Sequence, residues 1–434
     1  MLIWKTQTLN ANIASLRYRC LLPYNYLAKK GIDQRIYGGT DKVELAANTK
    51  AIAFVKSFKD EDMETCDRAA LLGVPIILDL CDNIFIQGYA ATSSYVPADN
   101  FRRMARQASA IVTTGEALKA EIKKAIAPLD LPIIVIPDGC ETQADLSEAF
   151  RITWQIWLSD RAGKLALQRS QAAYYKAKRR ARNLIVRLKI QIKRNMGNEE
   201  MPLSSKQTDS SNASASNNAS DKSLVQPTPF FPQRWPDAKP GTKTILWFGN
   251  HGAKYGSFGM SSILQVAPTI EQLSRELPLR LVVVSNSQAK YERYIQPLPF
   301  ETIYRRWHPQ KTYDYIRQSD VVIVPNSQSG FSMCKSANRV VLSLSQGTPV
   351  VANYTPALES FQDCVIMDDW DWGLRQYLCH PEVAQAHIAA AKRAIAQNFS
   401  GDKIAQQWLT LLESISDSRD RRAIAKPNEV AEAK

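Results

Sequence analysis

Short apolar runs alternate with helical patterns along this chain, and the alternation occurs twice. Runs of the first half lie at 2–4, 34–37, 51–55, 75–80, 109–113 and 132–136. Runs of the second half lie at 243–248, 279–284, 300–304, 320–324, 348–351 and 365–367. Strands that alternate with helices favour parallel sheets with helices on both faces. The sequence therefore predicts an α/β protein with two doubly wound, Rossmann-like domains.

The rhythm also predicts the domain boundaries. We expect an N-terminal domain at 1–150 and a C-terminal domain at 241–380, followed by helices at 381–415 and a loose tail at 416–434. The intervening segment has a different composition. Residues 151–194 favour helix, whereas 195–240 are rich in Ser, Asn and Pro and predict a disordered linker. Two doubly wound domains imply a cleft, with a ligand at the carboxyl ends of the strands.

Positive charge is concentrated in the insertion. Residues 161–194 contain twelve Lys or Arg and no Asp or Glu, out of a net charge of +13 for the whole chain. An anionic membrane surface would attract such a segment, and Trp154, Trp157, Tyr174 and Tyr175 nearby suit a lipid interface. The alternatives are a solvated or partner-bound helix. Nucleic acid is disfavoured, because no recognisable nucleic-acid-binding fold accompanies the basic segment.

Other features place the chain in the cytoplasm, with peripheral attachment to the inner face of the membrane as an extension. The sequence shows no signal peptide and no run of eighteen apolar residues. Its seven cysteines are scattered and its four histidines have no ligand spacing, so we expect reduced thiols, no structural metal and no cofactor.

The segment KSANRVVLSLSQGTPVVAN (residues 335–353) has a polar beginning and an apolar end. The apolar spacing predicts a helix that Gly347 closes in a left-handed conformation, followed by a strand. On that helix Lys335, Asn338 and Arg339 would share one face near the positive end of the dipole. An anion there would stabilise the arrangement, and the alternative is a solvated helix face.

Several motifs together resemble a GT-B glycosyltransferase of the family 4 type. They are the glycine-rich loop GNHGAKYG after the first strand of the second half, the phrases QSDVVIVPNSQSGF and SLSQGTPVVA, and, in the first half, DLCDNIF and IVIPDG. The resemblance covers about 1–140 and 241–415. It implies a nucleotide-sugar donor bound by the C-terminal domain and a sugar, glycolipid or polysaccharide acceptor bound by the N-terminal domain.

The resemblance also implies which residues bind the donor. The expected set comprises Gly249, Asn250, His251, Gly252, Lys254, Arg305, Arg306, Ser329, Gly330, Phe331, Lys335, Ser336, Asn338 and Arg339. Arg305 and Arg306 are expected on a loop after the strand at 300–304. The family's two glutamates, separated by seven residues, are missing, because Cys334 and Leu342 stand in their places. Cations can neutralise a diphosphate leaving group without a metal.

Asp79 and Asp82, at the end of the strand at 75–80, are the candidate catalytic residues on the acceptor side. A carboxylate there could serve an inverting enzyme as general base, whereas a retaining enzyme of this fold needs none. The alternative is that Asp82 or Asn83 caps the next segment and Asp79 orders the loop. We expect a retaining, metal-independent hexosyltransferase.

Three other functions remain open from the sequence. The first is a nucleotide-sugar epimerase or hydrolase on the same fold. The second is a binding or scaffolding protein that has lost catalysis, which the missing glutamates favour. The third is a tether whose function lies in residues 161–240. Turnover of a nucleotide-sugar separates the enzymes from the scaffold, and deletion of 161–240 tests the tether.

Overall fold

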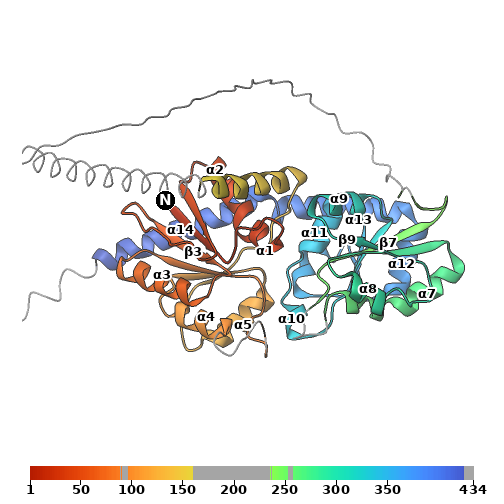
Figure 1. The fold of residues 1–434 in the computed structure, drawn as a ribbon, viewed down its shortest axis with the longest axis horizontal. Helices are drawn as coiled ribbons and strands as arrows, with labels where there is room; N and C mark the ends of the chain where they lie inside the picture. The colour runs from red at the N-terminus through yellow and green to blue at the C-terminus, as the bar shows by residue number, and fades with distance from the viewer. Residues whose placement is uncertain (88, 90–95, 160–234, 236, 253–257, 425–434) are drawn as a thin grey trace, which may run out of the picture. The chain divides into compact units, whose positions relative to one another are not determined.

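The computed structural model describes residues 1–87, 89, 96–159, 235, 237–252 and 258–424 (Figure 1). Met1–Thr153 and Pro232–Lys434 form one compact unit that contains both sheets, and Trp154–Phe231 form another. The predicted basic segment at 161–194, most of the linker and Lys254 lie outside the described residues.

The N-terminal domain is built on a parallel sheet with the strand order β2-β1-β3-β4-β5-β6. The strands are β1 (Leu2–Thr6), β2 (Gln34–Gly38), β3 (Ala51–Val55), β4 (Ile76–Leu80), β5 (Ala110–Thr113) and β6 (Ile133–Val135). Each coincides with a predicted run. The helices are α1 (Ala14–Leu16), a π-helical turn η1 (Arg17–Leu21), α2 (Leu22–Lys29), α3 (Asp60–Leu71), α4 (Pro97–Ala105) and α5 (Glu116–Ile126).

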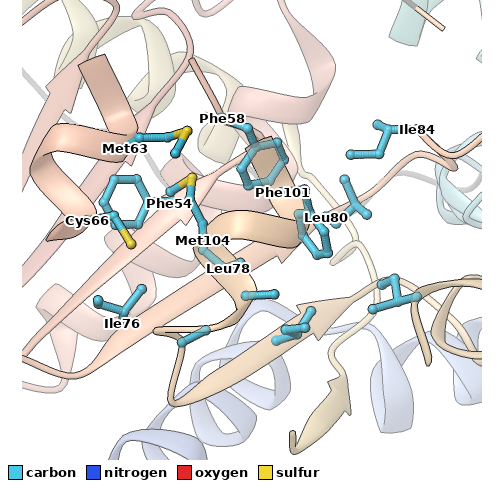
Figure 2. Close-up of a cluster of buried hydrophobic side chains, with 14 of the residues drawn as sticks. Phe54, Phe58, Met63, Cys66, Ile76, Leu78, Leu80, Ile84, Phe101 and Met104 are labelled. Carbon is cyan, nitrogen blue, oxygen red and sulfur yellow. The ribbon is translucent and has the colours of Figure 1, made fainter. Parts of the chain in front are cut away.

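One face of this sheet carries the core of the N-terminal domain. Phe54, Leu78 and Phe101 are completely buried and pack with residues of α3 and α4. Figure 2 shows these side chains converging with Phe58, whose ring lies edge to face with that of Phe101 at a centroid distance of 5.1 Å. Burial of this apolar surface fixes β3 and β4, and therefore the loops that leave their carboxyl ends.

The C-terminal domain repeats the plan with the order β12-β11-β10-β7-β8-β9. The strands are β7 (Lys243–Phe248), β8 (Leu279–Ser285), β9 (Thr302–Arg306), β10 (Val321–Val324), β11 (Val350–Ala352) and β12 (Ile366–Met367). The helices are η2 (Met260–Gln265), α7 (Ala267–Glu276), α8 (Gln288–Tyr294), α9 (Pro309–Arg317), α10 (Gly330–Met333), α11 (Asn338–Ser345), η3 (Pro356–Phe361) and α12 (Trp370–Cys379). Separate apolar clusters cover its two faces, as a doubly wound sheet requires.

The C-terminal helices α13 (Pro381–Asn398) and α14 (Gly401–Ile424) return the chain to the N-terminal domain. Trp408 of α14 is buried against Trp4 of β1, with ring centroids 4.8 Å apart. Gly401 lets α14 approach α2 closely, because a Cβ atom there would lie 2.2 Å from the Tyr26 ring. The two domains are therefore joined by α14 as well as by the linker.

The described elements extend across three of the expected boundaries. A helix spans 143–159, so the boundary expected at 150 falls inside it. The linker expected to run to 240 ends earlier, because Trp235 is buried between Tyr315, at a ring distance of 5.0 Å, and the guanidinium of Arg280. Helix α14 continues to Ile424, past position 416, where the tail was expected to begin. Among the described helices, none is long and apolar enough to cross a membrane.

Candidate active site

A pocket of about 520 Å³ opens where the carboxyl ends of the two sheets meet. Its wall includes residues within two positions of strand ends: Lys56 after β3, Asp82 after β4, Gly249 after β7 and Asn326 after β10. Of these strands, β3, β7 and β10 lie next to the topological switch points. At such points the loops diverge to opposite faces of the sheet and leave room for a ligand. The predicted cleft is present.

Arg339, in the first turn of α11, lines this pocket and is partly buried. Its guanidinium donates one hydrogen bond of 3.3 Å to the side-chain oxygen of Asn326, and it has no ion pair within the described part of the chain. Burial lowers the pKa of Arg339 to about 10. A Cβ atom on Gly249 would lie 3.5 Å from this guanidinium, so the glycine leaves space beside the cation. The geometry suits an anion.

Lys335 is also at the pocket, but it does not lie on α11. The helix begins at Asn338, and Cys334 to Ala337 connect it to the short helix α10. The prediction that Lys335 and Arg339 share a helix face is wrong, because the apolar helical spacing begins only at Ala337. The Lys335 ammonium lies 2.5 Å from a carboxylate oxygen of Asp82 and 4.0 Å above the Phe331 ring.

Asp82 also pairs with a second lysine. Lys56, after β3, contacts the other carboxylate oxygen. Burial alone would raise the pKa of Asp82, but Lys335 and Lys56 outweigh it and hold that pKa well below its ordinary value. Asp82 is therefore a carboxylate at neutral pH. Because both oxygens are engaged by cations, it is a weak candidate for a general base in this state.

The structure does not bring Asp79 to the pocket. Asp79 is completely buried and pairs through both oxygens with Arg19, at 3.0 and 2.6 Å. Burial raises the pKa of Asp79, and Arg19 opposes that shift. Asp79 thus orders Arg19, which also reaches Asp138 at 3.4 Å. The other Asp138 oxygen accepts a hydrogen bond of 2.6 Å from Ser336, which lines the pocket.

The loop after β7 contributes Gly249 and Asn250 to the pocket wall. Gly252 has a φ of 91°, and a Cβ atom there would lie 2.2 Å from the Phe258 carbonyl oxygen, so this turn requires glycine. His251 lies outside the wall, where its imidazole contacts the Asn286 side chain at 2.6 Å. Lys254 lies beyond the described residues.

Ser329, Gly330 and Phe331 do not line the pocket. The Ser329 hydroxyl caps α10, and the Gly330 carbonyl accepts a hydrogen bond of 3.3 Å from Asn83 of the N-terminal domain. Phe331 is buried in the core of the N-terminal domain, 4.5 Å from the Phe258 ring. These residues fasten one domain to the other, and Ser332 is the first of this segment to reach the pocket.

Arg305 and Arg306 were expected on a loop, but both belong to β9. The strand begins two residues later than its apolar run suggests. Arg305 pairs with Asp237 and lies over the Trp235 ring, and Arg306 is exposed. Neither lines the pocket. The pocket instead contains Arg17, Glu141 and Tyr313, which sequence reasoning missed.

These three residues form a buried network across the two domains. Arg17 donates a hydrogen bond of 2.6 Å to Glu141, and the Tyr313 hydroxyl donates one of 3.0 Å to the other oxygen of the same carboxylate. The partners are 124 and 172 positions apart, so no local pattern joins them. Only the "IPDG" turn just before Glu141 could have drawn attention to that residue.

Solved structures resemble the chain over nearly its whole length. A crystal structure of Anabaena HepE in complex with UDP and glucose matches with a TM-score of 0.52 at 10% identity, covering 95% of this chain and 99% of that chain. A glycosyltransferase from Rickettsia africae matches with a TM-score of 0.51 at 10% identity, covering 95% and 98%. Both resemble this chain in its paired parallel sheets. The chain has the GT-B fold.

This structural similarity shows the fold alone, so the chemistry of the pocket has to be inferred from its residues. No protein-family model matches the sequence, and no curated protein does. Cys334 and Leu342 stand at the two positions that correspond to glutamates in the family 4 pattern. Leu342 is part of the pocket wall, while Cys334 is buried next to Asn83. The wall has Asp82, Asp138 and Glu141 as its carboxylates, and the N-terminal domain supplies all three.

Proposed function

We propose that this protein is a glycosyltransferase that moves a sugar from a nucleoside diphosphate-sugar to an acceptor hydroxyl, in polysaccharide or glycoconjugate synthesis. The observation that carries the proposal is Arg339, a cation on the pocket wall without a counter-charge in the described residues. A partly desolvated cation of this kind gains most from a ligand that brings the negative charge. HepE, which has a similar fold, was solved in complex with UDP, which supports a nucleotide donor.

The diphosphate would lie against Arg339, Ser336 and Asn338, with the loop at Gly249 leaving room for it. Lys335 is close enough in the chain to join them. Two cations stabilise the negative charge that develops on a departing diphosphate, which is the task a metal performs in other enzymes. We therefore assign a metal-independent reaction.

The state of Asp82 supports transfer with retention. The acceptor oxygen would form its bond to the anomeric carbon on the face from which the phosphate oxygen departs. The proton of the acceptor hydroxyl would pass to the departing phosphate oxygen. No protein base is needed in such a step, which agrees with an Asp82 carboxylate that is paired with Lys56.

A second proposal concerns contact of the protein with a membrane. Trp154 and Trp157 are 58% and 45% exposed and stack at a ring distance of 5.0 Å. They directly precede the basic segment at 161–194. Exposed tryptophans beside many cations suit the headgroup region of an anionic bilayer. We place the enzyme in the cytoplasm with peripheral contact to such a surface, where a lipid-linked acceptor would be available.

Release of nucleoside diphosphate from donors tests the activity. Purified protein would be incubated with UDP-, ADP-, GDP- and dTDP-glucose and the corresponding N-acetylglucosamine donors, with and without EDTA. We expect one nucleotide to be released, equally in EDTA, and release at least about tenfold slower in Arg339→Ala. Arg306→Ala is the matched control, because this arginine is exposed outside the pocket. Tight binding of a nucleotide without any release would favour the scaffolding alternative.

A further inference from the structure

The ammonium of Lys335 is held by the N-terminal domain. It contacts Asp82, which lies 253 positions earlier in the chain, at 2.5 Å. Its second contact is the face of Phe331 at 4.0 Å, and that ring is itself buried in the N-terminal core. A charge-assisted hydrogen bond and a cation–π contact therefore hold the Lys335 ammonium against the acceptor side.

Asp82 has a second cationic partner, which would remain if Lys335 moved away. Lys56 contacts its second oxygen, and the side chains of Asp82, Lys56 and Lys335 are 13%, 24% and 37% exposed. The cluster thus has two cations for one carboxylate, with Lys335 the most accessible of the three. If Lys335 left, Asp82 would remain paired with Lys56. Departure of Lys335 therefore costs less than exposure of an unpaired buried carboxylate would.

The two cations assigned to the diphosphate are in different states. Within the described residues, the Arg339 side chain has one hydrogen bond, to a neutral amide. Lys335 is already paired with a carboxylate. A lysine ammonium that faces Asp82 at hydrogen-bond distance must break or share that contact to reach a phosphate. The carboxylate and the phosphate are thus competitors for one ammonium group.

We propose that Asp82 competes with the donor diphosphate for Lys335, so that donor binding transfers Lys335 to the phosphate and leaves Asp82 with Lys56. The proposal rests on the proposed function and assigns Asp82 as a positioning residue. Before the donor binds, Lys335 and Asp82 are paired with each other. Neither the phosphate-binding ammonium nor that oxygen of the acceptor-side carboxylate is then available to a ligand. Binding of the donor moves Lys335 to the phosphate and releases the Asp82 oxygen that Lys335 held, so the donor should bind before the acceptor.

Inorganic pyrophosphate is the probe, because it needs no choice of base or sugar. Calorimetric titrations would compare wild type, Asp82→Asn, Lys335→Ala and the double variant, and the nucleoside diphosphate that binds wild type best would serve as a second probe. We expect Asp82→Asn to tighten binding about fivefold to tenfold, because Lys335 becomes available. In the Lys335→Ala background the same substitution should change affinity by less than about twofold.

The design separates the competing explanations. Equal tightening by Asp82→Asn in both backgrounds would attribute the gain to the general charge of the pocket and overturn the proposal. So would unchanged or weaker binding by Asp82→Asn, provided that its thermal unfolding and circular dichroism match wild type. If neither pyrophosphate nor any of UDP, ADP, GDP and dTDP binds wild type, the proposed function itself fails.

Discussion

At the scale of single residues, charge pairing decides which side chains are structural and which are available to a ligand. Asp79 and Asp82 are three positions apart, the first within the apolar strand β4 and the second just after it, and one is buried against Arg19 while the other faces the pocket. The arginines divide in the same way. Arg19 has two carboxylate partners, while Arg339 has none in the described residues.

Asp79→Asn tests the structural assignment. Removal of the charge would leave Arg19 buried with the neutral Ile136 carbonyl and the long contact to Asp138, so we expect a loss of about 3–5 kcal/mol in the free energy of unfolding. Asp99→Asn is the matched control, because its partner Arg102 is exposed and such a pair contributes less than about 1 kcal/mol. Urea unfolding of both variants measures the difference. Equal losses would show that the buried Asp79–Arg19 pair contributes no more to the free energy of unfolding than the exposed Asp99–Arg102 pair.

The pH dependence of diphosphate binding tests the state of Arg339. Its pKa is lowered to about 10, so the binding-competent cation is complete below pH 9 and is lost as the pH rises through 10. An ordinary arginine would stay charged over that range. In the Lys335→Ala background, which removes the neighbouring lysine, we expect affinity at pH 11 to be about tenfold lower than at pH 9. Constant affinity, with the fold intact by circular dichroism, would contradict the lowered pKa.

At the scale of elements, the alternation of apolar runs and helical patterns was sufficient to predict the strands of both sheets. Strand β9 shows the limit, because its apolar run begins before the ladder and two arginines complete the strand. The connection around Lys335 shows another. The apolar spacing begins only at Ala337, so it gave no reason to place Lys335 on the helix, and Lys335 lies in the connection between α10 and α11.

The candidate site was less predictable than the fold. Residues that follow strands, such as Asp82 and Gly249, could be placed near the pocket because parallel strands end at one edge. Arg17 and Glu141 could not, because their pairing depends on how a π-helical turn and the "IPDG" turn pack together. The capture of Phe331 by the other domain likewise depends on tertiary packing.

The return of α14 to the N-terminal domain gives a prediction at this scale. Trp408→Ala would remove a ring that is 1% exposed and packs on Trp4, so we expect a loss of about 3–5 kcal/mol in the free energy of unfolding. Trp372→Ala is the control for tryptophan content, because that ring is 51% exposed. Its loss should stay below about 1 kcal/mol. Similar losses in urea unfolding would indicate that α14 contributes little to stability.

At the scale of the whole molecule, the charge distribution separates two tasks. The two sheets form a GT-B fold whose pocket combines cations of the C-terminal domain with carboxylates of the N-terminal domain. In the sequence, the excess positive charge belongs to a different segment, residues 161–194. Donor binding and surface attachment should therefore respond to different substitutions.

Vesicle binding tests the surface attachment. We expect the full chain to co-sediment with vesicles of phosphatidylglycerol and phosphatidylcholine more than with phosphatidylcholine alone, and binding to fall with salt. A Trp154→Ala/Trp157→Ala variant should bind the anionic vesicles at least about threefold less, because the exposed rings no longer enter the interface. Trp372→Ala, another exposed tryptophan, is the control. Equal binding to both vesicle types would contradict attachment to an anionic membrane surface.

The central claim is that the pocket binds the diphosphate of a nucleotide-sugar through Arg339. Calorimetric titration of UDP, ADP, GDP and dTDP into wild type, Arg339→Ala and Arg306→Ala tests it most directly. We predict that one nucleotide binds clearly more tightly than the others, that Arg339→Ala weakens it at least tenfold, or about 1.4 kcal/mol, and that Arg306→Ala leaves it unchanged. Absence of binding to wild type, or equal effects of the two substitutions, would contradict the claim.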